Sequence, residues 1–166
     1  NEYSHTISFI GAGEQAKTQL EAIGLVREIN HVKIYDINKE QAEKFSTWIN
    51  ERFYVKLNIC ENAKNACEGA DIIITTTPSR IPLLKKEYVA KGAHINAIGA
   101  DAPGKQELES ILLKESKIVI DDWEQASHSG EINVPLSGGI ITKQNIYAEL
   151  GDIVNGKKKG RENNDE

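Results

Sequence analysis

Three groups of residues in this sequence have types and spacings that could do chemistry. The first is Gly11-Ala-Gly-Glu-Gln-Ala16, a glycine-rich turn between an apolar run and a helical pattern. Gly11 permits a tight turn, Gly13 leaves room for a phosphate near the backbone, and Ala16 allows close packing of helix on strand. The amides at the start of the following helix favour an anion. The pattern therefore indicates a site for the pyrophosphate of a dinucleotide.

The second group is a single carboxylate, Asp36, which ends the β-rich run His31–Asp36. It follows Ala16 by about 20 residues, the spacing at which dinucleotide-binding proteins carry an acid. A carboxylate there accepts hydrogen bonds from the adenosine ribose and repels a 2′-phosphate, and no arginine follows closely. These residues predict NAD as the cofactor in preference to NADP. An ordinary turn aspartate and the acid of an S-adenosylmethionine-binding methyltransferase are the alternative interpretations.

The third group, Gly99-Ala-Asp-Ala-Pro-Gly-Lys105, carries one carboxylate, Asp101, between glycines. At the carboxyl end of a strand such a loop could bring its backbone close to a nicotinamide ring. Asp101 could then act as a general acid or base toward a substrate amine or imine, while a turn aspartate before Pro-Gly is the structural alternative. Thr75-Thr-Thr-Pro78 could line the middle of the cofactor or merely end a strand. Glu131 lies in a loop from which it could approach a ligand.

An α/β sheet with parallel strands would bring these groups together. The sequence predicts helices over residues 14–28, 61–68 and 146–155, and a further helix capped by Asn38. Alternation of helices with strands favours a doubly wound parallel sheet, the Rossmann fold, with about six strands and helices on both faces. Ligands of such sheets bind at the carboxyl ends of the strands, where all three groups fall. The predicted strands are Thr6–Ile10, His31–Asp36, Val55–Ile59, Asp71–Thr75, Gly92–Ile98 and Lys117–Asp121.

Composition indicates a globular domain and disfavours several kinds of partner. The 166 residues are 27% charged and 39% hydrophobic, with a net charge of −5, which gives no reason to expect nucleic acid. No apolar run reaches the roughly 18 residues that cross a bilayer. Two cysteines, Cys60 and Cys67, suggest a reducing, cytoplasmic compartment rather than a metal site. We expect one domain over residues 1–156 and a loose polar tail over residues 157–166.

Several motifs together resemble the ornithine cyclodeaminase/μ-crystallin family, over nearly the whole chain. The loop Gly99–Glu107 has the sequence Gly-Ala-Asp-Ala-Pro-Gly-Lys-Gln-Glu, which resembles the archaeal-type alanine dehydrogenase branch more than the Gly-Gly-Asp-Cys-Pro-Gly-Lys-Thr-Glu loop of cyclodeaminases. Family members are longer, with a substrate-binding and dimerisation domain to which nothing here corresponds, so we expect the cofactor domain alone. The motifs that carry the resemblance are Ile10–Leu20, Gly69–Ser79, Gly92–Leu108, Gly130–Leu136 and Tyr147–Gly156.

The resemblance implies the NAD-binding domain of an amino-acid dehydrogenase, one that oxidises L-alanine to pyruvate and ammonia by hydride transfer to NAD. The alternatives are the cofactor domain of an ornithine cyclodeaminase, which converts ornithine to proline and ammonia, and a non-catalytic NAD-binding module. Asp101 matches the family's catalytic aspartate. The parent is expected to be a cytoplasmic homodimer without a metal, and this chain alone to be inactive. The residues expected at the cofactor are Gly11, Ala12, Gly13, Glu14, Gln15, Asp36, Ile37, Thr75, Thr76, Thr77, Pro78, Ile98, Gly99 and Ala100.

Overall fold

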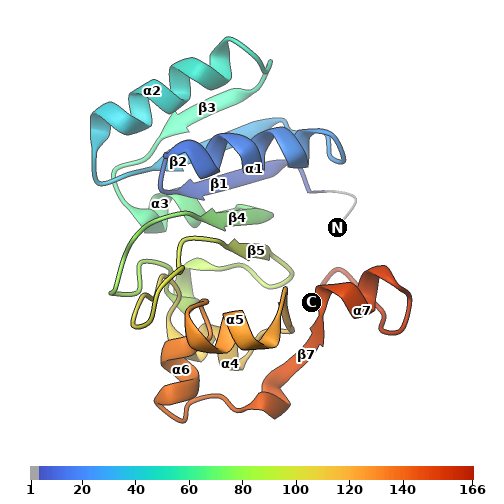
Figure 1. Ribbon diagram of the computed structural model, residues 1–166. Coiled ribbons are helices and arrows are strands. Elements are labelled where there is room, and N and C mark those ends of the chain that lie inside the picture. The colour runs from blue at the N-terminus through green and yellow to red at the C-terminus, as the bar shows by residue number, and fades with distance from the viewer. Residues whose placement is uncertain (1–3) are drawn as a thin grey trace.

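A five-stranded parallel sheet forms the centre of the computed structural model, which describes residues 4–166. Its strands are β1 (Thr6–Ile10), β2 (His31–Tyr35), β3 (Lys56–Ile59), β4 (Ile72–Thr75) and β5 (His94–Ala97), in the order β3-β2-β1-β4-β5 (Figure 1). The order reverses between β1 and β4, which places the ligand crevice of such a sheet at that point. The predicted doubly wound α/β fold is confirmed; the first three residues of the predicted domain lie outside the described range.

Alternation along β1 explains why helices cover both faces of the sheet. Successive side chains of a strand point to opposite faces, so Ile7 and Phe9 lie on one face and Ile10 on the other. The first face packs against α1 (Glu14–Gly24) and α2 (Lys39–Asn50), and the second against α3 (Ala63–Cys67). The central strand β4 is buried throughout, as its continuous β-branched sequence predicts.

The predicted cap of the second helix is confirmed. The Asn38 side-chain oxygen accepts hydrogen bonds from the backbone amides of Glu40 and Gln41, at 3.0 and 3.4 Å. This satisfies two of the amides that the first turn of α2 would otherwise leave unpaired. The cap therefore fixes the chain immediately after Asp36.

The last predicted strand and helix differ from what the structure shows. The sixth strand forms as β6 (Ile118–Ile120), but it pairs in a separate two-stranded sheet with β7 (Ile146–Glu149). The prediction of a helix over 146–155 was wrong in its first part, because only α7 (Leu150–Val154) is helical there. Apolar residues four apart fit a helix as well as a short strand followed by a turn, and pairing with β6 selects the strand.

Short elements of the second half cover the Ile10 face of the sheet. They are η1 (Lys86–Tyr88), α4 (Ser110–Lys114), α5 (Trp123–His128), α6 (Asn133–Ser137) and η2 (Lys143–Asn145). With β6 they bury Leu112, Ile118 and Ala126 in one cluster with Ile73 of β4. In Figure 1 α4, α5 and α6, yellow to orange, lie below the sheet. No helix within residues 4–166 has the length and apolar character needed to cross a membrane.

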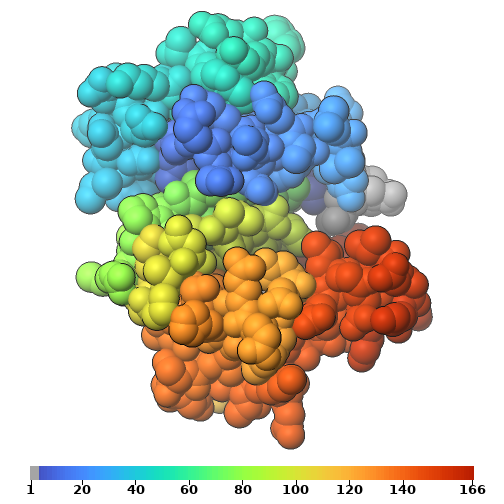
Figure 2. All heavy atoms as spheres, viewed as in Figure 1, coloured from blue at the N-terminus to red at the C-terminus, as the bar shows by residue number. Residues whose placement is uncertain are grey.

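The C-terminal residues 157–166, which we expected to be loose, form no helix or strand but contact the rest of the chain. Lys117 Nζ donates to the Gly160 carbonyl at 2.8 Å and to the Glu166 carboxylate at 2.9 Å. Arg161 donates to the Gly92 carbonyl at 2.9 Å. Figure 2 shows the end of the chain, in red, as a solid mass beside the orange residues.

Candidate functional site

Two backbone hydrogen bonds extend the sheet past its carboxyl edge. The Thr76 amide donates to the Ile10 carbonyl, and the Ile98 amide donates to the Thr75 carbonyl, both at 2.9 Å. They hold the segments that follow β1, β4 and β5 side by side at the reversal of strand order. The residues predicted to do chemistry therefore start from one fixed edge.

The glycine turn after β1 has the geometry that its sequence predicts. Gly11 has φ +99°, and a Cβ there would lie 2.9 Å from the carbonyl and hydroxyl oxygens of Thr76. A Cβ at Gly13 would meet no atom within 4 Å, so the space beside it is open. Gly13 is the N-cap of α1 and supplies no side-chain acceptor to the first-turn amides. The open space and the uncapped helix N-terminus fit a pyrophosphate group.

Asp36 is fixed against this turn. Its Oδ2 accepts a hydrogen bond from the Ala12 amide, and its Oδ1 accepts one from the Asn38 amide, each at 2.8 Å. A carboxylate oxygen has two lone pairs, so both oxygens can still accept from ribose hydroxyls. Ile37, which follows, exposes 92% of its surface. The acid and an open apolar side chain thus lie together at the end of β2, where the adenosine half was expected.

The threonines after β4 differ in where their side chains lie. Thr75, which we expect at the middle of the cofactor, has a fully buried side chain. Thr76 donates its hydroxyl hydrogen to the Gly11 carbonyl at 3.2 Å, and Thr77 donates to Glu107. Pro78 is exposed. The structure therefore places the Thr76 hydroxyl against the glycine turn and the Thr77 hydroxyl against Glu107, whereas the Thr75 side chain is buried.

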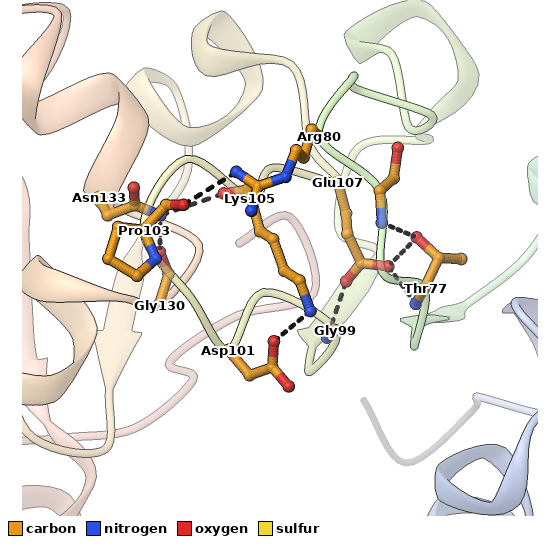
Figure 3. A network of polar contacts seen from close by, with 10 residues as sticks. Thr77, Arg80, Gly99, Asp101, Pro103, Lys105, Glu107, Gly130 and Asn133 are labelled. Atoms are coloured by element: carbon orange, nitrogen blue, oxygen red, sulfur yellow. Dashed lines mark hydrogen bonds and ion pairs between the residues drawn. The ribbon is translucent and has the colours of Figure 1, made fainter.

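Asp101 lies in the exposed part of the loop after β5 and forms an ion pair with Lys105 (Figure 3). The Asp101 side chain is 74% exposed, whereas that of Lys105 is only 19% exposed. The hydrogen bond and positive charge of Lys105 lower the pKa of the Asp101 carboxyl. Asp101 is therefore a carboxylate at neutral pH, able to accept a proton and accessible to a molecule outside the chain.

A second group of contacts fixes the backbone of this loop from behind. The Asn133 side chain accepts from the Gly104 amide at 2.9 Å and donates to the Lys105 carbonyl at 3.1 Å. Arg80 donates to the Pro103 carbonyl at 3.0 Å. Figure 3 shows these residues on the side of the loop opposite the Asp101 side chain. The loop is consequently held on its inner side and open on the side of Asp101.

Sequence reasoning missed Glu107, the residue that joins the loops after β4 and β5. Its carboxylate is fully buried. Oε1 accepts from the Thr77 amide at 2.5 Å and from the Thr77 hydroxyl at 2.7 Å, while Oε2 accepts from the Gly99 amide at 2.8 Å. Figure 3 shows the carboxylate pointing between these two residues. The only sequence signal was its place in the motif Gly92–Leu108, because a glutamate in a polar loop is ordinarily exposed.

Glu131, which we considered near a ligand, is instead buried behind Glu107. Its Oε1 accepts from the backbone amides of Glu107 and Leu108, at 3.0 and 2.7 Å. Burial raises the pKa of Glu131 to about 8, although the two amide hydrogen bonds act in the opposite direction. Glu131 is therefore buried and supports the segment that carries Glu107.

The cysteines and the remaining acids form no further site in the part of the chain that the structure covers. Within residues 4–166 no three His, Cys, Asp or Glu side chains are grouped as ligands for a metal ion. Cys60 and Cys67 are free thiols, and burial raises the pKa of Cys67 to about 11. A buried thiol with this pKa is a poor nucleophile at neutral pH.

Comparisons with known proteins identify the family of this chain. The profile of the ornithine cyclodeaminase/mu-crystallin family matches residues 1–166. Alanine dehydrogenase of Archaeoglobus fulgidus is 47% identical over 165 residues, which are 98% of this chain and 50% of that protein.

Two solved structures superpose closely. An archaeal alanine dehydrogenase dimer with bound NAD has a TM-score of 0.96 at 46% identity, over 100% of this chain and 51% of the other. The Thermococcus litoralis Delta(1)-pyrroline-2-carboxylate reductase in complex with NADH and L-proline also has a TM-score of 0.96, at 39% identity, over 100% and 52%. The chain thus spans about half the length of these relatives. The resemblance found in the motifs is confirmed, and the chain belongs to the ornithine cyclodeaminase/mu-crystallin family.

Proposed function

We propose that this chain binds NAD at the carboxyl ends of β1, β2, β4 and β5 and is the cofactor-binding part of an amino-acid oxidoreductase. The observation that carries the proposal is the Asp36 carboxylate, held 2.8 Å from the Ala12 amide beside the open space at Gly13. A carboxylate in this position accepts hydrogen bonds from the ribose hydroxyls and repels a 2′-phosphate. The relatives solved with bound NAD and with NADH support the same cofactor.

For the reaction we propose oxidation of L-alanine to pyruvate and ammonia. The relative named alanine dehydrogenase and the sequence of the loop Gly99–Glu107 support this substrate. The relative solved with NADH and L-proline favours a second candidate, the interconversion of L-proline and its cyclic imine. Both reactions change the same bond, the one between the amino nitrogen and Cα. A cyclodeaminase acting on ornithine would begin with the same step.

In the proposed oxidation, the Cα–H bond breaks, the substrate nitrogen loses a proton, and a C=N imine forms. NAD, when bound, supplies the acceptor for the hydride. Asp101 is ionised and exposed, so it can take the proton from the nitrogen or from a water that adds to the imine carbon. The C–N bond then breaks, ammonia leaves, and the oxo acid remains. Lys105 keeps Asp101 charged and oriented at the start of this sequence.

The wider setting is also a proposal. Because a relative is described as a dimer, we propose a homodimer for the protein that contains this chain. We propose that residues outside 4–166 hold the substrate amino acid against Asp101. We propose a cytoplasmic location, since both thiols are free and NAD-linked amino-acid oxidation is intracellular chemistry. Light scattering of the purified protein at micromolar concentration measures its mass directly.

Calorimetry tests the cofactor first. We expect NAD and NADH to bind this chain and S-adenosylmethionine not to bind, with NADP weaker than NAD. No heat with NAD at millimolar concentration would end the proposal. The substrate is tested on the protein as its gene encodes it, by NADH formation with L-alanine, L-proline or L-ornithine. Turnover with L-alanine supports the first candidate, whereas L-proline formed from L-ornithine would replace it. NAD binding without any turnover would indicate a module that only binds.

A further inference from the structure

The Glu107 carboxylate is the connection between the two loops on the nicotinamide side of the proposed site. It accepts three hydrogen bonds, two from Thr77 after β4 and one from Gly99 after β5. The Thr77 hydroxyl itself accepts from the Ser79 amide at 3.3 Å, so its own hydrogen is available for Glu107. All of the donors therefore point at the carboxylate, which both loops surround.

The connection leaves no room for a side chain at Gly99. A Cβ there would overlap the Thr77 carbonyl oxygen and lie 2.6 Å from the Glu107 carboxyl carbon. The sequence predicts that the loop bracketed by this glycine could bring its backbone close to a nicotinamide ring. The structure shows that its missing side chain is needed for contact with Thr77 and Glu107.

The backbone of Glu107 is anchored separately from its side chain. Its carbonyl accepts from the amides of Leu83 and Leu84 at 2.7 and 2.9 Å, and its amide donates to Glu131 at 3.0 Å. Glu107 is thus fixed to the body of the domain on one side and directs its carboxylate to the two loops on the other. Changing the carboxylate alone should leave the backbone in place.

We propose that Glu107 is a positioning residue that sets the nicotinamide end of the cofactor site by fixing the Thr77 and Gly99 backbones relative to each other. The inference rests on the proposed NAD binding. Asp101 follows Gly99 by two residues, so the same contact places the proposed catalytic carboxylate. Glu107 is fully buried, so in this proposal it acts through the segments that it holds.

The substitution Glu107→Gln removes the connection between the two loops with little change in the shape of the side chain. The glutamine oxygen can still accept from the Thr77 amide and hydroxyl, but its NH₂ group then faces the Gly99 amide, and two donors form no hydrogen bond. The loop after β5 should lose its anchor, while the glycine turn and Asp36 keep theirs. The matched control is Glu109→Gln, the same change two residues further, where the side chain accepts from the Lys86 amide at 3.0 Å.

Measuring the affinity for two ligands distinguishes a positioning role of Glu107 from a general structural role. Calorimetry on the protein as its gene encodes it measures Kd for NADH and for ADP-ribose, which lacks the nicotinamide. We expect Glu107→Gln to raise the Kd for NADH about tenfold, or about 1.4 kcal/mol. The Kd for ADP-ribose should change by less than about twofold. The Glu109→Gln protein should bind both ligands like the unaltered protein. Equal weakening of both ligands in Glu107→Gln, or an unchanged ratio of the two constants, would overturn the inference.

A second variant covers the case in which Glu107→Gln does not fold. Thr77→Val keeps the amide donor and the side-chain shape but removes the hydroxyl donor to Glu107. Thr77→Val should also raise the Kd for NADH more than the Kd for ADP-ribose. An unchanged ratio of the two Kd values would count against the proposal. If the unaltered protein binds neither ligand, the proposed function itself fails and this inference fails with it. If it binds both equally well, NAD binding stands and the inference alone is wrong.

Discussion

The Asp36 carboxylate accepts a hydrogen bond from the Ala12 backbone amide at 2.8 Å, across 24 residues of sequence. This contact ties the end of β2 to the glycine turn after β1. The position of the acid is consequently set by the turn that would hold the pyrophosphate. The two halves of the proposed adenosine diphosphate site are thus fixed to one another before any ligand arrives.

Replacing Asp36 should change the preference for the cofactor. In Asp36→Ser the ribose hydroxyls lose a charged acceptor, an interaction worth about 1.5–3 kcal/mol, so NAD should bind roughly 10- to 100-fold more weakly. The repulsion of a 2′-phosphate also disappears, and the NAD-to-NADP affinity ratio should fall toward one. The control Asn62→Ala removes the cap of α3, where the Asn62 side chain accepts from the Asn65 amide at 2.9 Å. It should cost about 1 kcal/mol of stability and leave the ratio unchanged. Retention of the full NAD preference in Asp36→Ser would exclude the assigned role.

Replacing Asp101 should separate binding from turnover. Asp101→Asn keeps the shape of the side chain but removes its capacity to take a proton, so turnover of the gene-encoded protein should be lost. The carboxylate is exposed and supports no element of the fold, so NAD affinity and Tm should remain close to those of the unaltered protein. Steady-state kinetics and calorimetry on the same sample measure both. Full activity in Asp101→Asn would remove this residue from the mechanism.

Replacing Lys105 should shift the pH dependence of the reaction. Lys105 lowers the pKa of Asp101, so Lys105→Met should raise that pKa toward its ordinary value. If Asp101 must be ionised to take a proton, the acidic limb of the kcat/KM profile moves to higher pH. The matched control is Lys44→Met, which breaks the exposed ion pair with Glu40 on α2, four residues away like Asp101 and Lys105. An acidic limb that stays in place in Lys105→Met would contradict the pairing.

A methyl group at Gly99 should destabilise the domain and weaken the binding of the cofactor. In Gly99→Ala the added carbon overlaps the Thr77 backbone, and overpacking of this kind typically costs about 1–3 kcal/mol. Gly151→Ala is the control, because a Cβ there meets nothing within 4 Å and the residue lies inside α7. Urea denaturation gives both free energies of unfolding. Equal stability of the two variants would show that the loops can separate without cost.

The stability of the domain should depend on the ionisation of Glu131. The pKa of Glu131 is raised by burial to about 8, from an ordinary value of 4.5. A raised pKa means that the folded chain binds the proton more tightly than the unfolded chain, so this contribution to stability is complete below pH 4.5 and is lost as pH rises through 8. Glu131→Gln carries no such charge. The Tm of the unaltered protein should therefore fall relative to that of Glu131→Gln between pH 5 and pH 9, and parallel curves would contradict the shift.

Local patterns predicted the first half of the chain well, for a physical reason. The run Thr6–Ile10, the glycine turn and Asp36 each follow from neighbours in sequence, since strands, turns and caps depend on local backbone preferences. The strand β7 (Ile146–Glu149) was not predictable in that way. Its conformation is decided by pairing with β6, whose residues lie more than 20 positions earlier. A short apolar segment adopts whichever conformation its tertiary partner can use.

The supporting carboxylates were hidden from sequence reasoning for a related reason. Thr77 lies 30 residues from Glu107, and Glu131 lies 24 residues from it. A glutamate is ordinarily exposed, so only the positions of its donors reveal that it is buried and satisfied. Asp101 could be singled out because exposed acids between glycines are visible in the sequence, while the residues that hold it in place were not.

The contact between Gly99 and Glu107 closes a loop on itself, with its two ends only eight residues apart. The conformational entropy of the loop is therefore lost when the domain folds, rather than when a ligand binds. Residues between Gly99 and Glu107 can therefore change while the contact that joins the two ends of the loop is kept. A substitution at Ala102, between the two ends, would then alter what the site accepts without disturbing how the cofactor is held, which gives this scaffold a place to acquire new substrates.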